Sequence, residues 1–301
     1  MPVHVVRTVR PIPAVRLIPT AYVRACHPEV VVVLLDKGAR IDATGGIGQT
    51  ALHVAASNGH TEVVRLLIDR GASIDATGSI GQTALHVAAS NGHTEVVRLL
   101  IDRGASIDAT GSIGQTALHI AASNCHLEVV QVLLGTGSSI DARGDAGQTA
   151  LHSAAQCGHP EVVKELLDRG ANIDTTDTTS QTALHLAAQC GYLDVVKVLL
   201  GKGASINAVD CMSRTALHST CAAEHGHTEV VKLLLGSGAS IEAITVLRSA
   251  VTDRGAHSMG LPTPRRGTKK PAAHNGEGTM ARPGRQDMGP ERRRGRTRGG
   301  G

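Results

Sequence analysis

Histidine is the residue of this chain whose type and number first suggest chemistry. The 301 residues include 16 histidines, and imidazole serves proteins as a general base and as a metal ligand. Eleven of these histidines recur at two positions of a regular spacing. One set is His53, His86, His119, His152, His185 and His218, and the other is His60, His93, His126, His159 and His227. A residue that returns at constant spacing meets a repeated structural need, so these histidines do not predict a reaction centre.

The sequence contains no arrangement typical of a catalytic or metal site. Nucleophilic catalysis needs one histidine beside a nucleophile, with a third group to orient it, and no single set of residues stands out in this way. The phosphate-binding pattern G-x-x-x-x-G-K-[ST] and the zinc pattern H-E-x-x-H are both missing from the sequence. We therefore expect no enzyme activity, no cofactor and no bound metal.

The cysteines predict free thiols in a reducing compartment. None of the six forms a C-x-x-C pair. Cys157 and Cys190 are 33 residues apart, which would place them on neighbouring helices about 8 to 10 Å apart, beyond the roughly 7 Å that a disulfide spans between Cα atoms. We expect two half-buried free thiols there, and the alternative is a reactive sensor pair.

A 33-residue repeat positions all of these side chains. The sequence T-A-L-H begins at Thr50, Thr83, Thr116, Thr149, Thr182 and Thr215, and residues 50–82 and 83–115 are identical. Thr50 is a natural N-cap, so a first helix should run from there to Asn58, where Gly59 would end it in the left-handed conformation. A second helix should begin near Thr61 and end at Gly71.

Each unit has too few apolar side chains to form a core alone. The chain has neither Phe nor Trp, and the apolar positions follow helical spacing; in the first full unit they are Leu52, Ala55, Ala56, Val63, Val64, Leu66, Leu67 and Ile74. Neighbouring units must supply the other wall, which predicts a solenoid. The small alanines would let the paired helices approach closely.

The motifs T-A-L-H-x-A-A, G-H-x-E-V-V-x-L-L and G-A-x-I-D-A at a period of 33 resemble the ankyrin repeat over residues 27 to about 243. The resemblance implies an all-α solenoid of antiparallel helix pairs joined by projecting β-hairpin loops, with a concave surface that binds proteins. It also implies that the T-x-x-H histidine ties the loop to the start of the first helix. The family's loop-tip Asp is kept only at Asp177 and Asp210.

The repeat loses its regularity at the N-terminal end. Residues 1–26 are predicted to be irregular, because Pro19 occupies the position of Leu52 and proline interrupts a helix interior. Residues 27–49 match only the second half of a unit. This end is interpreted either as an improvised cap or as a truncated gene. Six repeats follow, at residues 50–82, 83–115, 116–148, 149–181, 182–214 and 215–249.

The C-terminal end departs from the pattern as well. The sixth repeat has two extra residues between Thr215 and Gly226, which a π-type bulge or a longer loop would absorb. After Ala243 the pattern lapses. Since solenoids need terminal caps, we expect either a partial helix over residues 244–253 or a chain that is a fragment of a longer array.

Charge separates the repeats from the C-terminal tail. The formal net charge is +4, but residues 254–301 carry 12 basic and three acidic side chains, so the rest of the chain has a net charge of −5. Residues 250–301 are rich in Arg, Gly and Pro and are predicted to be disordered. The basic clusters suit nuclear import or contact with nucleic-acid phosphates. No aromatic residue is interleaved for base stacking, so strong single-strand binding is not expected.

The N-terminal arginines and the hydropathy pattern bear on the location of the protein in the cell. Four arginines without an acidic residue give residues 1–26 a faint likeness to an organelle transit peptide, but four prolines would interrupt its helix. The longest apolar run, at residues 30–35, has six residues, far short of the roughly 20 that a membrane span requires. We expect no membrane association, and a cytoplasmic or nuclear location.

Sequence variation between repeats indicates where selective binding would occur. The loop tips and the ends of the first helices change most across residues 143–214, and drift on a solvated surface is the alternative explanation. The predicted protein-binding residues are Arg143, Asp145, Gln156, Thr176, Thr178, Gln189, Val209 and Met212. The expected function is a non-enzymatic scaffold or adaptor. The alternatives are a sensor array detached from a larger signalling protein, and a nuclear or RNA-associated adaptor that uses the basic tail.

Overall fold

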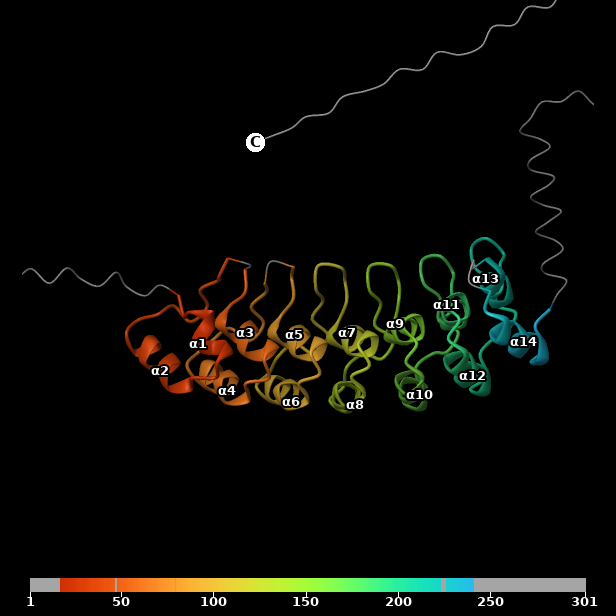
Figure 1. Ribbon diagram of the computed structural model, residues 1–301. Helices are drawn as coiled ribbons and strands as arrows, with labels where there is room; N and C mark the ends of the chain where they lie inside the picture. Colours follow the sequence, from red (N-terminus) through yellow and green to blue (C-terminus); the bar gives the residue numbers. More distant parts are fainter. Residues whose placement is uncertain (1–16, 47, 79, 223–225, 241–301) are drawn as a thin grey trace, which may run out of the picture. The chain divides into compact units, whose positions relative to one another are not determined.

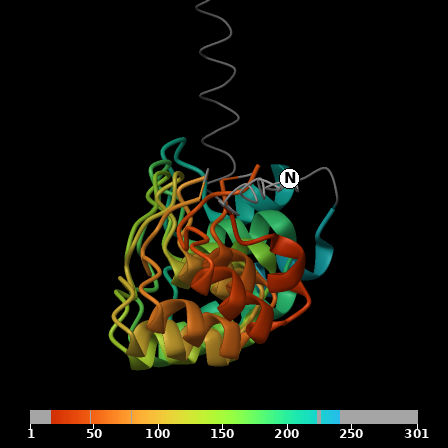
Figure 2. The ribbon, with the colours of Figure 1, turned by 90° about the vertical axis from the view of Figure 1, so that its left-hand side faces the viewer.

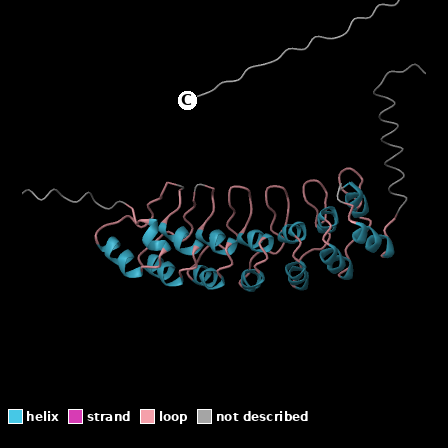
Figure 3. Ribbon diagram, in the orientation of Figure 1, coloured by secondary structure: helices cyan, strands magenta, loops and turns pink. Residues whose placement is uncertain are grey.

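The computed structural model describes residues 17–46, 48–78, 80–222 and 226–240, without the side chains of residues 221 and 222. Over these residues the chain forms fourteen helices and no strand (Figure 3). The first helices of the pairs are α1 (Thr20–Arg24), α3 (Ala51–Ser57), α5 (Ala84–Ser90), α7 (Ala117–Ser123), α9 (Ala150–Cys157), α11 (Ala183–Cys190) and α13 (Ala216–Ala222). The second helices are α2 (Pro28–Asp36), α4 (Thr61–Asp69), α6 (Thr94–Asp102), α8 (Leu127–Gly135), α10 (Pro160–Asp168), α12 (Leu193–Gly201) and α14 (Thr228–Gly236).

The helices of the repeat array form two layers. Each first helix packs against the first helices of neighbouring repeats and against its own second helix, and the second helices stack in the same way. The loops that connect successive repeats project together along one side (Figure 1), and they remain a separate layer when the array is seen from its end (Figure 2). The solenoid predicted from the 33-residue period is confirmed.

Short sequence signals determine where the helices begin and end. Thr50 is the N-cap of α3 with extended backbone, and the third helical residue, His53, completes a capping box. Gly59 follows the helix with a φ of 71°, and Gly71 follows the second helix with a φ of 89°, where the absence of a Cβ removes the steric penalty. The predicted start at Thr61 is also confirmed.

The core is aliphatic and continuous along the array. Its largest fully buried side chains are all Leu or Ile, and Ala55 and Ala56 are completely buried where α3 packs against its neighbours. Two predicted core residues, Leu66 and Ile74, are only half-buried and pack against the core from its edge. Leu66 lies within α4, beside the fully buried Leu67, and Ile74 lies in the loop after this helix, so the neighbouring elements cover both side chains only in part.

The loops have the outline of hairpins but contain no strand in the part of the chain that the structure describes. In one loop the Gly78 N–H donates to the Gln82 carbonyl oxygen and the Gly81 N–H donates to the Gly78 carbonyl oxygen, both at 2.9 Å, and these two bonds close the tip. The next bond runs to the neighbouring loop, from the Ser112 N–H to the Ile80 carbonyl oxygen at 3.3 Å. Because the loops bond to each other one residue at a time, they form a row rather than a sheet.

The two ends of the array depart from the internal repeats. Pro19 is the N-cap of α1, so this helix begins only after the proline and has five residues. At the other end α13 has seven residues, as α3 does, and α14 begins at Thr228. Residues 223–225, between these two helices, lie outside the described part of the chain. The predicted segment 244–253, the basic tail and residues 1–16 lie outside the described residues.

Candidate protein-binding surface

One set of repeated histidines joins each repeat to the next. The His119 Nδ1 lies 2.9 Å from the Thr116 hydroxyl and accepts from the Thr116 N–H at 3.3 Å. Its Nε2 lies 2.9 Å from the Gln148 carbonyl oxygen in the following loop. A carbonyl oxygen only accepts, so Nε2 carries the proton and the ring is neutral. The same three contacts recur at His53, His86, His152 and His185.

Burial reinforces the neutral form of these five imidazoles. It lowers the pKa of His53, His86, His119, His152 and His185 below the ordinary value, and the hydrogen bond to the loop carbonyl offsets only part of this effect. His218 has no following loop among the described residues, and its buried Nε2 has no hydrogen-bond partner there. The first histidine set is therefore a structural clamp, as the ankyrin resemblance implies.

The second histidine set ties each repeat to the preceding one. The His93 Nε2 lies 3.0 Å from the Ser57 carbonyl oxygen at the end of α3, and His60, His126 and His159 make the equivalent contact. Over the residues that the structure describes, no group of three or more His, Cys, Asp or Glu could hold a metal ion. The histidines of both sets therefore hold neighbouring repeats together by hydrogen bonds to backbone carbonyl oxygens.

The predicted binding residues of the middle loops lie side by side. The Arg143 guanidinium donates to the Thr176 carbonyl oxygen of the next loop at 2.9 Å. The Thr178 N–H and hydroxyl both donate to the Ala146 carbonyl oxygen at 3.0 Å. Arg143, Asp145 and Thr178 are exposed, and Thr176 is half-buried. The structure thus brings these four residues onto adjoining tips.

The last complete loop presents two apolar side chains to solvent. Val209 is 53% exposed and Met212 is 60% exposed. Between them the Asp210 carboxylate accepts from the Met212 N–H and from the Arg214 N–H, both at 2.9 Å. Asp177 closes the preceding loop in the same way. The family's tip aspartates therefore shape the loops, and the residues beside them are the ones available for contact.

The predicted first-helix residues lie at the C-terminal ends of α9 and α11. Gln156 and Gln189 are both exposed there, one residue before Cys157 and Cys190. These cysteines are free thiols, but they are exposed and not half-buried, which corrects the expectation from the sequence. Although both residues are exposed, nearby protein atoms displace part of the water around each thiol, and this desolvation raises the pKa of both. At Cys190 the charge of Cys157 raises the pKa further. A raised pKa disfavours the thiolate, which argues against a reactive pair.

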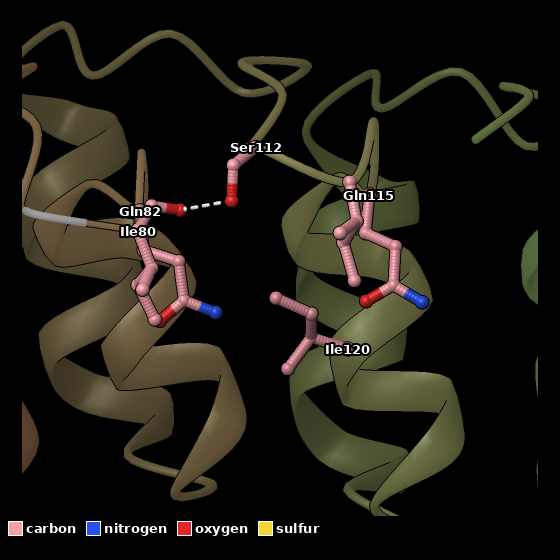
Figure 4. A pocket seen from close by; sticks show the side chains of 7 residues that line it. Ile80, Gln82, Ser112, Gln115 and Ile120 are labelled. Atoms are coloured by element: carbon pink, nitrogen blue, oxygen red, sulfur yellow. Dashed lines mark hydrogen bonds between the residues drawn. The ribbon is translucent and has the colours of Figure 1, made fainter. Parts of the chain in front are cut away.

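The sequence analysis missed an apolar pocket in the nearly identical repeats. It has a volume of about 240 Å³ and lies between two loops, where Ile80, Ile113 and Ile120 line it (Figure 4). Binding residues were predicted from variation between repeats, and residues 50–82 and 83–115 do not vary. The sequence did contain one indication of the pocket, an isoleucine at each of two loop tips. A polar residue at such an exposed position would not lower the stability of the fold.

A comparison with protein families decides the classification. The family model for ankyrin repeats matches residues 20–111, 107–177 and 172–245, in three copies. The chain belongs to the ankyrin-repeat family. No curated protein matches the sequence. Ankyrin repeats are in general non-enzymatic modules that bind other proteins. Over the described residues, no helix is both long and apolar enough to cross a membrane.

Proposed function

We propose that this ankyrin-repeat chain is a non-enzymatic scaffold or adaptor that binds partner proteins through its concave face and loop tips. Its selective contacts are Arg143, Asp145, Thr176, Thr178, Val209 and Met212 at the tips, with Gln156 and Gln189 beside them. The proposal includes a cytoplasmic or nuclear location.

One observation carries this proposal: the variable side chains are held on a fixed row of loops. The Arg143 and Thr178 hydrogen bonds join neighbouring tips, and the histidine clamps join each loop to the helix before it. A binding surface whose loops are already ordered loses less conformational entropy when a partner binds. Variation on such a surface changes the specificity and leaves the array intact.

Affinity capture with the full-length chain tests the proposal. We expect the double variant Arg143→Ala with Asp145→Ala to lose partners that the unmodified chain retains. The matched control is Glu95→Ala with Arg98→Ala, which removes one exposed acid and one exposed base from α6, in the second-helix layer. Circular dichroism should show equal helix content in all three proteins. If the tip variant captures the same set of proteins as the control, the selected tip residues are not the contacts.

The basic tail supports a second candidate, a nuclear or RNA-associated adaptor. The observation that favours it is the net charge of +9 on residues 254–301. Deleting these residues should abolish nuclear accumulation and leave capture by the repeats unchanged. Any binding of RNA through the tail should disappear at high salt, because phosphate contacts of this kind depend on counterion release. RNA binding that resists salt would contradict a purely electrostatic tail.

A further inference from the structure

The pocket between the loops of the first and second full repeats has an aliphatic interior. Ile80 and Ile113 stand at successive loop tips, 59% and 61% exposed, and Ile120 of α7 is only 8% exposed. Figure 4 shows Ile80 and Ile120 at one opening, which Ile113 also lines. At about 240 Å³ the pocket is smaller than the roughly 300 to 1,000 Å³ of a typical small-molecule site. It fits an aliphatic side chain better than it fits a whole ligand.

Two glutamines give the pocket a polar rim. The backbone carbonyl oxygens of Gln82 and Gln115 accept from His53 and His86, which fixes the position of each residue. Their side-chain amides line the pocket and have no hydrogen-bond partner among the described residues (Figure 4). Each amide offers both a donor and an acceptor, which matches the N–H and C=O groups of an extended peptide.

The spacing of the glutamines agrees with an extended peptide. They are one repeat apart, and packed helices lie about 8 to 10 Å from each other. A peptide in the extended polyproline II conformation advances about 3.1 Å per residue, with three residues per turn, so roughly three of its residues span the distance from one glutamine to the next. A peptide on this rim would present a side chain to the loops at every third residue.

The charge of the loop layer is negative here. Within residues 50–142, the segments outside the second helices contain three acidic residues, Asp75, Asp108 and Asp141, and two basic ones, apart from neutral histidines. The basic residues, Arg70 and Arg103, pair with Asp36 and Asp69 at the ends of α2 and α4. The Asp75 carboxylate accepts from the Ser106 N–H and hydroxyl at 3.1 and 2.6 Å, and Asp108 bonds to Ser138 and Ser139. These bonds leave the negative charges without a cation. A basic peptide is the complementary partner.

The aliphatic lining is confined to the near-identical repeats: the set one repeat earlier, Ile47, Ile80 and Val87, is aliphatic as well, although Ile47 lies outside the described residues. At the same positions one repeat later the three residues are Ile113, Ala146 and Ser153, and in the next gap they are Ala146, Thr179 and Leu186. Among the equivalent three-residue sets that lie wholly within the described residues, the set of Ile80, Ile113 and Ile120 alone consists of large aliphatic side chains. The near-identical repeats thus form a surface that the variable repeats lack.

We propose that this pocket, which we call the isoleucine socket, binds a basic, extended peptide segment by one aliphatic side chain, with the Gln82 and Gln115 amides bonded to the peptide backbone. The inference rests on the proposed protein-binding function and names a partner class and a site outside the variable loops. Loss of the socket would leave the predicted contacts at residues 143–212 in place.

Fluorescence anisotropy with the full-length chain tests the socket. The probe is a fluorescein-labelled peptide of four Lys-Ser-Leu units, which places a leucine at every third residue. We expect the double variant Ile80→Ala with Ile113→Ala to bind about tenfold more weakly, since burial of one leucine is worth roughly one factor of ten or more. The variant Gln82→Ala with Gln115→Ala should bind about three- to tenfold more weakly, from two lost hydrogen bonds.

Matched controls separate the socket from general attraction between charges. Val33→Ala truncates a similarly exposed apolar side chain on α2, outside the socket, and should leave the affinity within about twofold, because the side chain does not line the socket. A peptide with serine for leucine, and one with glutamate for lysine, should both bind weakly.

Several results would overturn the proposal. They are a parent peptide that does not bind, a serine peptide that binds as well as the leucine peptide, and an isoleucine variant with unchanged affinity. Sedimentation velocity could give a fourth such result. If the chain self-associates, and the Ile80→Ala with Ile113→Ala variant does not, the socket is an interface between two copies of the chain and not a peptide site. Capture experiments with the Arg143 and Asp145 variants report on the proposed function separately.

Discussion

Acidification should unfold this protein through its buried histidines. His119 is 1% exposed, and its two ring nitrogens are both occupied in the neutral form, one by Thr116 and the other by the Gln148 carbonyl. A second proton would go to Nδ1 and would point at the Thr116 N–H, which is itself a donor. The protonated ring would therefore break the capping box and place an unpaired charge in the core.

The sign of the pH dependence follows from the lowered pKa values. Burial holds the pKa of each of five clamp histidines below 6.5, so the unfolded chain binds more protons in the range just below that value. Stability is then fully present above about pH 7.5 and is lost as the pH falls through 6.5. If the five histidines stay unprotonated in the folded state, the free energy of unfolding falls by up to about 7 kcal/mol between pH 7.5 and 5.5. This is comparable to the whole stability of a typical domain, about 5 to 15 kcal/mol.

Urea unfolding followed by circular dichroism at pH 7.5, 6.5 and 5.5 measures this loss. The informative variant is His119→Gln, because glutamine is also accepted at the third position of a capping box and does not titrate. It should remove about one fifth of the pH dependence, on the order of 1 kcal/mol at most over this range. A midpoint that is the same at pH 7.5 and 5.5, or that rises on acidification, would refute the reasoning. Equal pH dependence of variant and parent would exclude His119 as a contributor.

Three further substitutions test packing, capping and backbone strain by the same urea assay. Ala88→Leu should lower stability by about 1 to 3 kcal/mol through overpacking, because Ala88 is completely buried; an unchanged midpoint would contradict the close helix approach. Thr149→Ala should cost about 1 kcal/mol by removing the N-cap of α9, and Thr149→Ser should retain most of that stability. Cys125→Gly should stabilise the protein by about 0.5 to 1 kcal/mol, because Cys125 has a φ of 62° where other repeats carry glycine. A less stable glycine variant would show that the thiol contributes more than the strain removes.

Much of the fold was predictable because its signals are local. Thr50 and His53 mark the start of a helix through bonds within one turn, and Gly59 marks its end through its own backbone conformation. The alanines of the first helix indicate close packing for the same reason, since their size is a property of each residue. A repeated unit also places every copy of such a signal at the same position.

The surface was harder to predict because it depends on how neighbouring repeats approach each other. The exposure of Cys157 and the half-burial of Leu66 depend on how much of each helix the neighbouring elements cover, which the 33-residue period leaves open. Variation between repeats indicated residues such as Arg143, which the structure places on the loop tips. It gave no indication of Ile80 and Ile113, because two identical repeats contain no variation to compare.

Each of the two socket glutamines, Gln82 and Gln115, connects stability with recognition. Its backbone carbonyl oxygen receives the histidine clamp of the preceding repeat, as Gln115 does from His86, so the residue cannot move without loss of that bond. Its side chain does not take part in the clamp and lines the isoleucine socket. Replacement of the glutamine side chain therefore alters the surface and spares the clamp, whereas replacement of the histidine disturbs both. In an array without aromatic residues, this division lets one position serve the fold through its backbone and a partner through its side chain.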